Sequence, residues 1–117
     1  MSHEKYKICI DACYDCATMC KRCIGACLED PDVKMLSRCI KLNNHCAGIC
    51  KLTATVMAGG NEYINEFCRL CAFICDNCAG ECVKHSQIEL CGQCAEACDK
   101  CADECRDVIR MSKVQVA

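Results

Sequence analysis

The sequence predicts an all-α protein: an antiparallel up-down-up-down bundle of four helices with a cysteine-lined core. Nineteen of the 117 residues are cysteine, which is well above the roughly 8–10% that marks a chain built around this residue. The cysteines form four groups separated by turn residues, and within the groups they recur mainly at alternating steps of three and four. This rhythm averages 3.5 residues, the spacing of a helix face packed in a bundle. We therefore expect residues 1–117 to form a single domain with a largely thiol interior.

The first two helices are predicted over residues 4–29 and 31–58. Between them, Asp30 is an acid suited to helix capping and Pro31 is suited to a first helical turn. We call the inward face of each helix its seam. The seam of the first helix carries Cys9, Cys13, Cys16, Cys20, Cys23 and Cys27. The second helix keeps the same phase with fewer thiols, at Cys39, Cys46 and Cys50, and with Leu36, Asn43, Thr53 and Met57 at other seam positions.

The third and fourth helices are predicted over residues 62–85 and 87–111. Gly59-Gly60-Asn61 breaks the chain before the third helix, and Ser86-Gln87-Ile88-Glu89 is a capping-box pattern that opens the fourth. Short connections make neighbouring helices antiparallel. The third seam carries Cys68, Cys71, Cys75, Cys78 and Cys82, and the fourth carries Cys91, Cys94, Cys98, Cys101 and Cys105.

The composition limits which classes of partner and which cellular compartment we expect for this protein. The charge is nearly balanced, with 14 basic and 16 acidic residues, and the chain has no tryptophan and only five Phe and Tyr residues. This composition argues against a nucleic-acid partner. No apolar run approaches the roughly 20 residues that span a membrane, and the N-terminus lacks a secretory signal. We therefore expect a cytoplasmic protein, in which dense cysteine indicates metal more often than disulfides.

The spacing indicates a store of soft metal ions. Thiols three or four residues apart on a helix lie about 5–6 Å from one another, so four facing seams would make a long tube lined with sulfur. Thiolates select Cu(I), zinc or iron–sulfur clusters. A straight helix cannot wrap its own seam around one tetrahedral zinc ion, and no ferredoxin-type loop is present. One Cu(I) per thiolate leaves no net charge, whereas four unshared thiolates around zinc leave −2 in a dry core, which is costly. We expect on the order of one Cu(I) per cysteine.

The chain resembles the cytosolic copper storage proteins of bacteria from Cys9 to Cys105. The motifs that carry the resemblance are Cys-Ile-Asp-Ala-Cys-Tyr-Asp-Cys (9–16), Cys-Arg-Leu-Cys-Ala-Phe-Ile-Cys-Asp-Asn-Cys (68–78) and Cys-Gly-Gln-Cys-Ala-Glu-Ala-Cys-Asp-Lys-Cys (91–101). The resemblance implies storage and sequestration of Cu(I), protection against copper toxicity, and a homotetramer of bundles. It also implies Cu(I) held mainly by Cys-x-x-x-Cys pairs: Cys9/Cys13, Cys16/Cys20, Cys23/Cys27, Cys46/Cys50, Cys71/Cys75, Cys78/Cys82, Cys94/Cys98 and Cys101/Cys105. Asn43, Thr53 and Met57 depart from the thiol pattern, so fewer sites are expected on the second helix.

The two ends of the tube are expected to differ. Apolar seam positions at Tyr6, Met57, Ile64 and Val108 close one end. At the other end, His85 takes the seam position after Cys82, and the resemblance also implies a histidine at the opening. We hypothesise that metal enters there, with His85 as an early or outermost ligand. The alternative is a histidine favoured only by the dipole of the helix C-terminus.

Other functions remain as alternatives. The thiols could buffer zinc or cadmium, or they could staple the bundle as disulfides. We expect no enzyme, because no nucleophile–base or paired-carboxylate constellation is evident and the Cys-x-x-Cys pairs lie in mid-helix rather than at a helix start. Exposed Leu70 and Phe73 suggest a contact between subunits.

Overall fold

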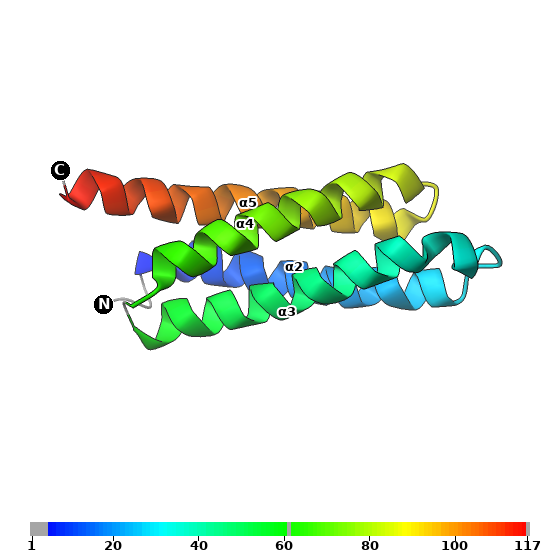
Figure 1. The fold of residues 1–117 in the computed structure, drawn as a ribbon, viewed down its shortest axis with the longest axis horizontal. Coiled ribbons are helices and arrows are strands. Elements are labelled where there is room, and N and C mark those ends of the chain that lie inside the picture. Colours follow the sequence, from blue (N-terminus) through cyan, green and yellow to red (C-terminus); the bar gives the residue numbers. More distant parts are fainter. Residues whose placement is uncertain (1–4, 61, 117) are drawn as a thin grey trace.

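A computed structural model describes residues 5–60 and 62–116 of the chain. Four α-helices follow one another: α2 (Lys7–Leu28), α3 (Ser37–Gly59), α4 (Ile64–Cys82) and α5 (Glu89–Val116). Two short 3-10 segments, η1 (Val33–Leu36) and η2 (Val83–His85), precede α3 and follow α4. Figure 1 shows the helices running alternately in opposite directions, with the α3–α4 turn at one end and the α2–α3 and α4–α5 turns at the other. The predicted antiparallel up-down-up-down bundle is confirmed.

The helices pack around a single thiol core. α2 packs against α3 and α5, and α4 packs against the same two helices, in a body of 52 × 22 × 18 Å. All nineteen cysteines are buried, with exposed fractions between 0% and 2%. Small buried residues such as Ala17, Ala47 and Ala72 flank the thiols and allow close approach between helices. The predicted seams are therefore confirmed on every helix.

The ends of the helices differ from the prediction. Asp30 does not cap α3, because its carboxylate accepts a hydrogen bond from the backbone N–H of Asp32 at 2.8 Å, and this local turn delays α3 until Ser37. α5 begins at Glu89, where the carbonyl of Ile88 accepts hydrogen bonds from two following backbone N–H groups. The capping box predicted from Ser86 is therefore wrong. α5 also continues to Val116, beyond the predicted residue 111.

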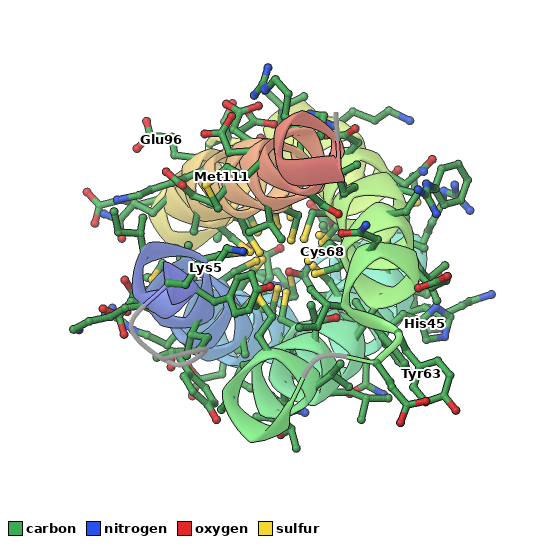
Figure 2. The ribbon with its side chains drawn as sticks, turned by 90° about the vertical axis from the view of Figure 1, so that its left-hand side faces the viewer. Lys5, His45, Tyr63, Cys68, Glu96 and Met111 are labelled. Carbon is green, nitrogen blue, oxygen red and sulfur yellow. The ribbon has the colours of Figure 1, made fainter. Side chains whose placement is uncertain are left out.

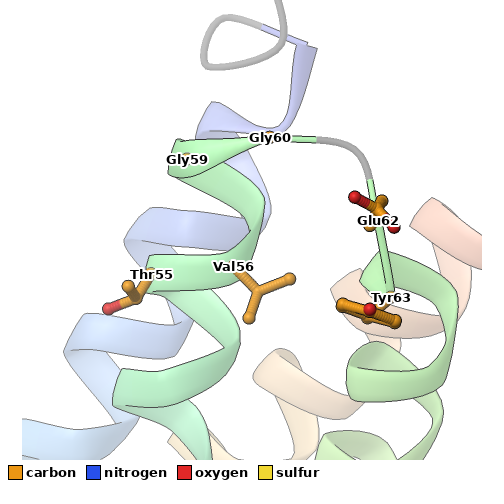
Figure 3. Close-up of a pocket in the computed structure, with 6 residues that line it drawn as sticks. All are labelled: Thr55, Val56, Gly59, Gly60, Glu62 and Tyr63. Atoms are coloured by element: carbon orange, nitrogen blue, oxygen red, sulfur yellow. The ribbon is translucent and has the colours of Figure 1, made fainter.

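The turn between α3 and α4 follows the predicted glycine break at Gly59 and Gly60, and Asn61 lies outside the described residues. Tyr63 ends this turn in a left-handed conformation (φ 66°), and its carbonyl accepts the Phe67 N–H at 2.9 Å. A surface pocket of about 310 Å³ opens here, lined by Thr55, Val56, Gly59, Gly60, Glu62 and Tyr63 (Figure 3). No cysteine lines this pocket, so it is separate from the thiol core.

Candidate metal centre

The sulfur ladder of α2 faces that of α5 in register. Each step forward along α2 is matched by an equal step back along α5, because the two helices are antiparallel and share the same alternation of spacing. The Sγ–Sγ distances are 3.7 Å for Cys9–Cys105, 3.6 Å for Cys13–Cys101, 3.6 Å for Cys16–Cys98, 3.7 Å for Cys20–Cys94 and 2.9 Å for Cys23–Cys91. The pairs form successive layers along the bundle axis.

α3 and α4 complete the tube. The sulfur of Cys46 lies 3.6 Å from that of Cys75 on α4, 3.8 Å from that of Cys16 on α2 and 3.8 Å from that of Cys98 on α5. One α3 thiol therefore contacts thiols of all three other helices. Viewed along the axis from the α3–α4 turn, sulfur atoms gather at the centre, while labelled side chains such as His45 and Glu96 point outward (Figure 2).

Four-sulfur sets recur through this core. Among the described residues, the sulfurs within each set lie no more than 4.8 Å from one another; the sets include Cys13/Cys71/Cys101/Cys105, Cys16/Cys46/Cys50/Cys75, Cys16/Cys20/Cys46/Cys98, Cys23/Cys27/Cys39/Cys91 and Cys50/Cys71/Cys75/Cys101. With metal–sulfur bonds of about 2.3 Å, sulfurs on one ion are about 3.8 Å apart in tetrahedral, 4.0 Å in trigonal and 4.6 Å in linear geometry. The sets share members, such as Cys16 and Cys50, so neighbouring ions would be linked by bridging thiolates.

These distances correct the geometric argument against zinc. A single helix cannot surround a tetrahedral ion, but the four helices together bring sulfurs to separations that such an ion accepts. Geometry alone therefore does not exclude zinc. The argument for Cu(I) is the charge of the filled core, since unshared zinc–thiolate sites would accumulate negative charge away from water.

Burial favours the neutral thiol over the thiolate throughout the core. Burial raises the pKa of Cys91 to about 11, and the neighbouring Cys27 adds to this shift. All nineteen cysteines are free thiols, and they hydrogen-bond to one another across the axis. Each metal ion that enters must displace protons from the sulfurs that bind it.

Asn43 takes the place of a thiol on the α3 seam, and it also makes hydrogen bonds that connect helices. Its side chain is fully buried, and its Nδ2 donates to the Cys39 carbonyl at 2.8 Å and to Cys82 Sγ at 3.2 Å. Its Oδ1 accepts a hydrogen bond from Cys94 Sγ at 3.0 Å. The amide thus connects α3 with the thiols of α4 and α5. A polar residue at a seam position was the signal in the sequence for this link.

The end predicted to be the mouth of the tube lies between the α2–α3 and α4–α5 turns, and its cysteines Cys27, Cys39, Cys82 and Cys91 are fully buried. Here His85 stands on η2 with 18% of its side chain exposed, and its Nε2 lies 3.1 Å from Glu81 Oε2. Glu81, which the sequence analysis missed, is itself only 8% exposed and also contacts Arg38 at 3.4 Å and Lys84 at 3.3 Å. Burial acts to raise the pKa of Glu81, but hydrogen bonds from His85 and Lys84 hold it below its ordinary value. Binding of metal by His85 stays a prediction.

The opposite end is closed, as predicted. Met57, Ile64 and Val108 are 0%, 5% and 5% exposed, and Tyr6 packs against the core beside them. Thr53 is also fully buried, and its hydroxyl donates to the Phe67 carbonyl at 3.5 Å. These side chains cover the end of the thiol core, and a surface pocket of about 200 Å³ beside them reaches Cys9.

A helical bundle with its axis occupied by overlapping four-sulfur sets is a protein built to hold many soft metal ions together. The model of the copper storage protein family matches residues 2–110, and the chain belongs to this family.

Relatives of known structure agree in fold. The copper storage protein of Streptomyces lividans loaded with 10 copper equivalents is 35% identical, with 92% of this chain and 85% of that chain covered and a TM-score of 0.87. The Cu(I)-bound copper storage protein 3 of Bacillus subtilis is 41% identical, with 92% and 97% covered and a TM-score of 0.82. An uncharacterized cysteine-rich protein of B. subtilis strain 168, YhjQ, is 43% identical over 83 residues, which are 70% of this chain and 77% of YhjQ.

Proposed function

We propose that this protein stores and sequesters Cu(I) in its core and so protects the cell from free copper. The observation that carries the proposal is the burial of all nineteen thiols in a tube, where the four-sulfur sets share members. The ligands are the nineteen core cysteines, with residues 1–117 acting as one storage domain. The protein holds its ions and catalyses no reaction; membership of a storage family supports this role.

The expected capacity is on the order of one Cu(I) per cysteine, because that ratio leaves the filled core without net charge. An anaerobic titration with Cu(I) against a strong chromophoric chelator tests it. A break near nineteen equivalents supports a store, whereas a break at one or two equivalents contradicts it. A parallel titration with zinc and cadmium tests the alternative of a buffer for other soft metals, which would hold many of those ions as tightly as Cu(I).

We place the uptake of copper at the mouth, with His85 as the outermost ligand. Since His85 Nε2 faces the Glu81 carboxylate at 3.1 Å, the other ring nitrogen, Nδ1, is the atom available to a metal ion. A carboxylate that holds a histidine in this way orients the ring and makes it a better ligand. Cys23, Cys27, Cys39 and Cys91 form the four-sulfur set among the turns at this end.

We further propose that the protein is cytoplasmic and assembles as a homotetramer. A relative from S. lividans is a cytosolic copper storage protein, and no helix of the described residues is long and apolar enough to cross a membrane. Phe73 and Leu70 on α4 are 66% and 46% exposed, and a groove of about 260 Å³ beside Phe73 separates α4 from Leu42 and His45 on α3. This face is the candidate subunit contact. Light scattering that gives the mass of one chain would contradict the assembly.

A further inference from the structure

The closed end of the tube contains a sulfur atom that is not a thiol. Met57 continues the α3 seam two helical turns beyond Cys50, and its side chain is fully buried. Its Sδ lies 4.0 Å from the Sγ of Cys68 on α4. Buried methionine ordinarily fills space, so the surroundings of this sulfur decide whether it does more.

Met57 lies where the other three helices end their cysteine ladders. Cys9 on α2, Cys68 on α4 and Cys105 on α5 are the last cysteines at this end. Cys9 Sγ lies 3.7 Å from Cys105 Sγ, and Cys68 lies close enough to both thiols for each of them to influence its pKa. In this layer α3 contributes a thioether where α2, α4 and α5 each contribute a thiol. Figure 2 views the bundle from this end, with Cys68 beside the central sulfurs.

The distance and the charge both suit Cu(I). Two sulfurs that share one ion in trigonal geometry are about 4.0 Å apart when the metal–sulfur bonds are about 2.3 Å, and this is the separation of Met57 Sδ and Cys68 Sγ. A thioether is a soft ligand of Cu(I) and carries no charge. It can therefore complete the coordination of an ion without adding negative charge to a core that is already balanced.

The other methionines of the described chain have different surroundings. Met35 and Met111 are 78% and 38% exposed. The sulfur of Met19 accepts a hydrogen bond from Arg22 at 3.7 Å on the exposed side of α2. Met57 is thus the methionine of the described residues whose sulfur lies among the core thiols.

We propose that Met57 is a Cu(I) ligand in a terminal site of the tube, together with Cys68 and the adjacent thiols of Cys9 and Cys105. The proposal rests on the storage of Cu(I) proposed above. If Met57 binds Cu(I), the closed end holds the last metal site of the core in addition to its apolar side chains.

X-ray absorption on selenomethionine-substituted protein tests the proposal. After anaerobic loading with Cu(I), the selenium spectrum should show a selenium–copper path in the wild-type protein. The path should persist in Met19→Leu, the matched control on α2, and disappear in Met57→Leu. Leucine is close in volume to methionine, so Met57→Leu should keep its helical circular dichroism while capacity falls by about one equivalent.

Three outcomes would overturn the proposal, and the first needs no variant. If the wild-type protein shows copper–sulfur paths but no selenium–copper path, Met57 only packs in the core and is not a ligand. Copper storage by the cysteines would still be supported. A selenium–copper path that survives in Met57→Leu would assign the ligand to another methionine. Protein that retains no copper and shows no copper–sulfur paths would reject the terminal site and the proposed function together.

Discussion

Glu81 is the residue that most distinguishes the mouth from the rest of the tube. Its carboxylate is 8% exposed and is shared among Arg38, Lys84 and His85. A charge so well buried is stable only when it is paired, and here the pairing orients the imidazole that we place at the point of copper uptake. In the proposed uptake, the carboxylate would act on copper through His85 rather than as a ligand among the thiols.

Replacing Glu81 should therefore slow copper uptake without emptying the store. We expect Glu81→Leu to lower the rate of Cu(I) uptake about tenfold, the lower end of the effect of losing a carboxylate behind a metal-binding histidine. Glu81→Gln keeps an acceptor for His85 Nε2–H and should retain most of the rate. Stopped-flow mixing with a Cu(I)–chelator complex measures both variants, and end-point capacity should stay within about one equivalent.

A double-mutant cycle separates this role from a general effect on the mouth. If Glu81 acts through the imidazole, Glu81→Leu should slow uptake little further once His85→Ala is present. An equal slowing in the presence and absence of His85 would show that Glu81 acts by another route.

At the scale of the helices, α3 is the weakest of the four ladders. Thr53 occupies a seam position on it, fully buried between thiol layers, and its hydroxyl makes one long hydrogen bond of 3.5 Å. Thr53→Cys should therefore place an additional thiol in the tube at little cost in packing. We expect the Cu(I) capacity to rise by about one equivalent, measured by the same chelator competition.

The control for this gain lies two residues away. Thr55 is exposed on the same helix, so Thr55→Cys adds a thiol outside the tube. It should react readily with an alkylating reagent and add no tightly held copper. A gain in both variants, or in neither, would mean that position in the tube does not determine binding.

Helix positions and the thiol core were predictable because the cysteine spacing is itself the helix period. The starts of α3 and α5 were not, since they depend on the local hydrogen bonds of Asp30 and Ile88 rather than on periodicity. Glu81 was missed for a different reason. Its burial depends on Arg38 on α3, a contact that does not follow from the sequence around Glu81, whereas the spacing of four residues between Glu81 and His85 was a signal for their pairing.

At the scale of the whole molecule, the core exchanges protons for copper, and its stability should follow pH accordingly. Cys91 has a folded pKa of about 11, raised mainly by burial from an ordinary value of 9.0. A raised thiol pKa favours the folded state fully below the unfolded value and loses this contribution as pH rises through the folded value. We expect the midpoint of thermal unfolding of the copper-free protein to fall between pH 9 and pH 11.

Loaded protein should respond differently, because its sulfurs are already deprotonated and bound to metal. Anaerobic circular dichroism of both forms across this range measures the effect. Both forms should be equally helical near neutral pH, since a core of neutral thiols needs no metal to fold. A copper-free protein that is unfolded at pH 7, or a loaded protein that loses stability in parallel with the copper-free form, would contradict this description of the core.

The most direct test of copper storage inside the bundle is the position of the metal itself. Crystals of protein loaded anaerobically with excess Cu(I) would be measured at the copper absorption edge. The anomalous map should show a file of many peaks along the bundle axis, each about 2.3 Å from two or three of the core sulfurs. Copper confined to one or two positions, or bound on the outer surface with the thiol tube empty, would contradict the storage function.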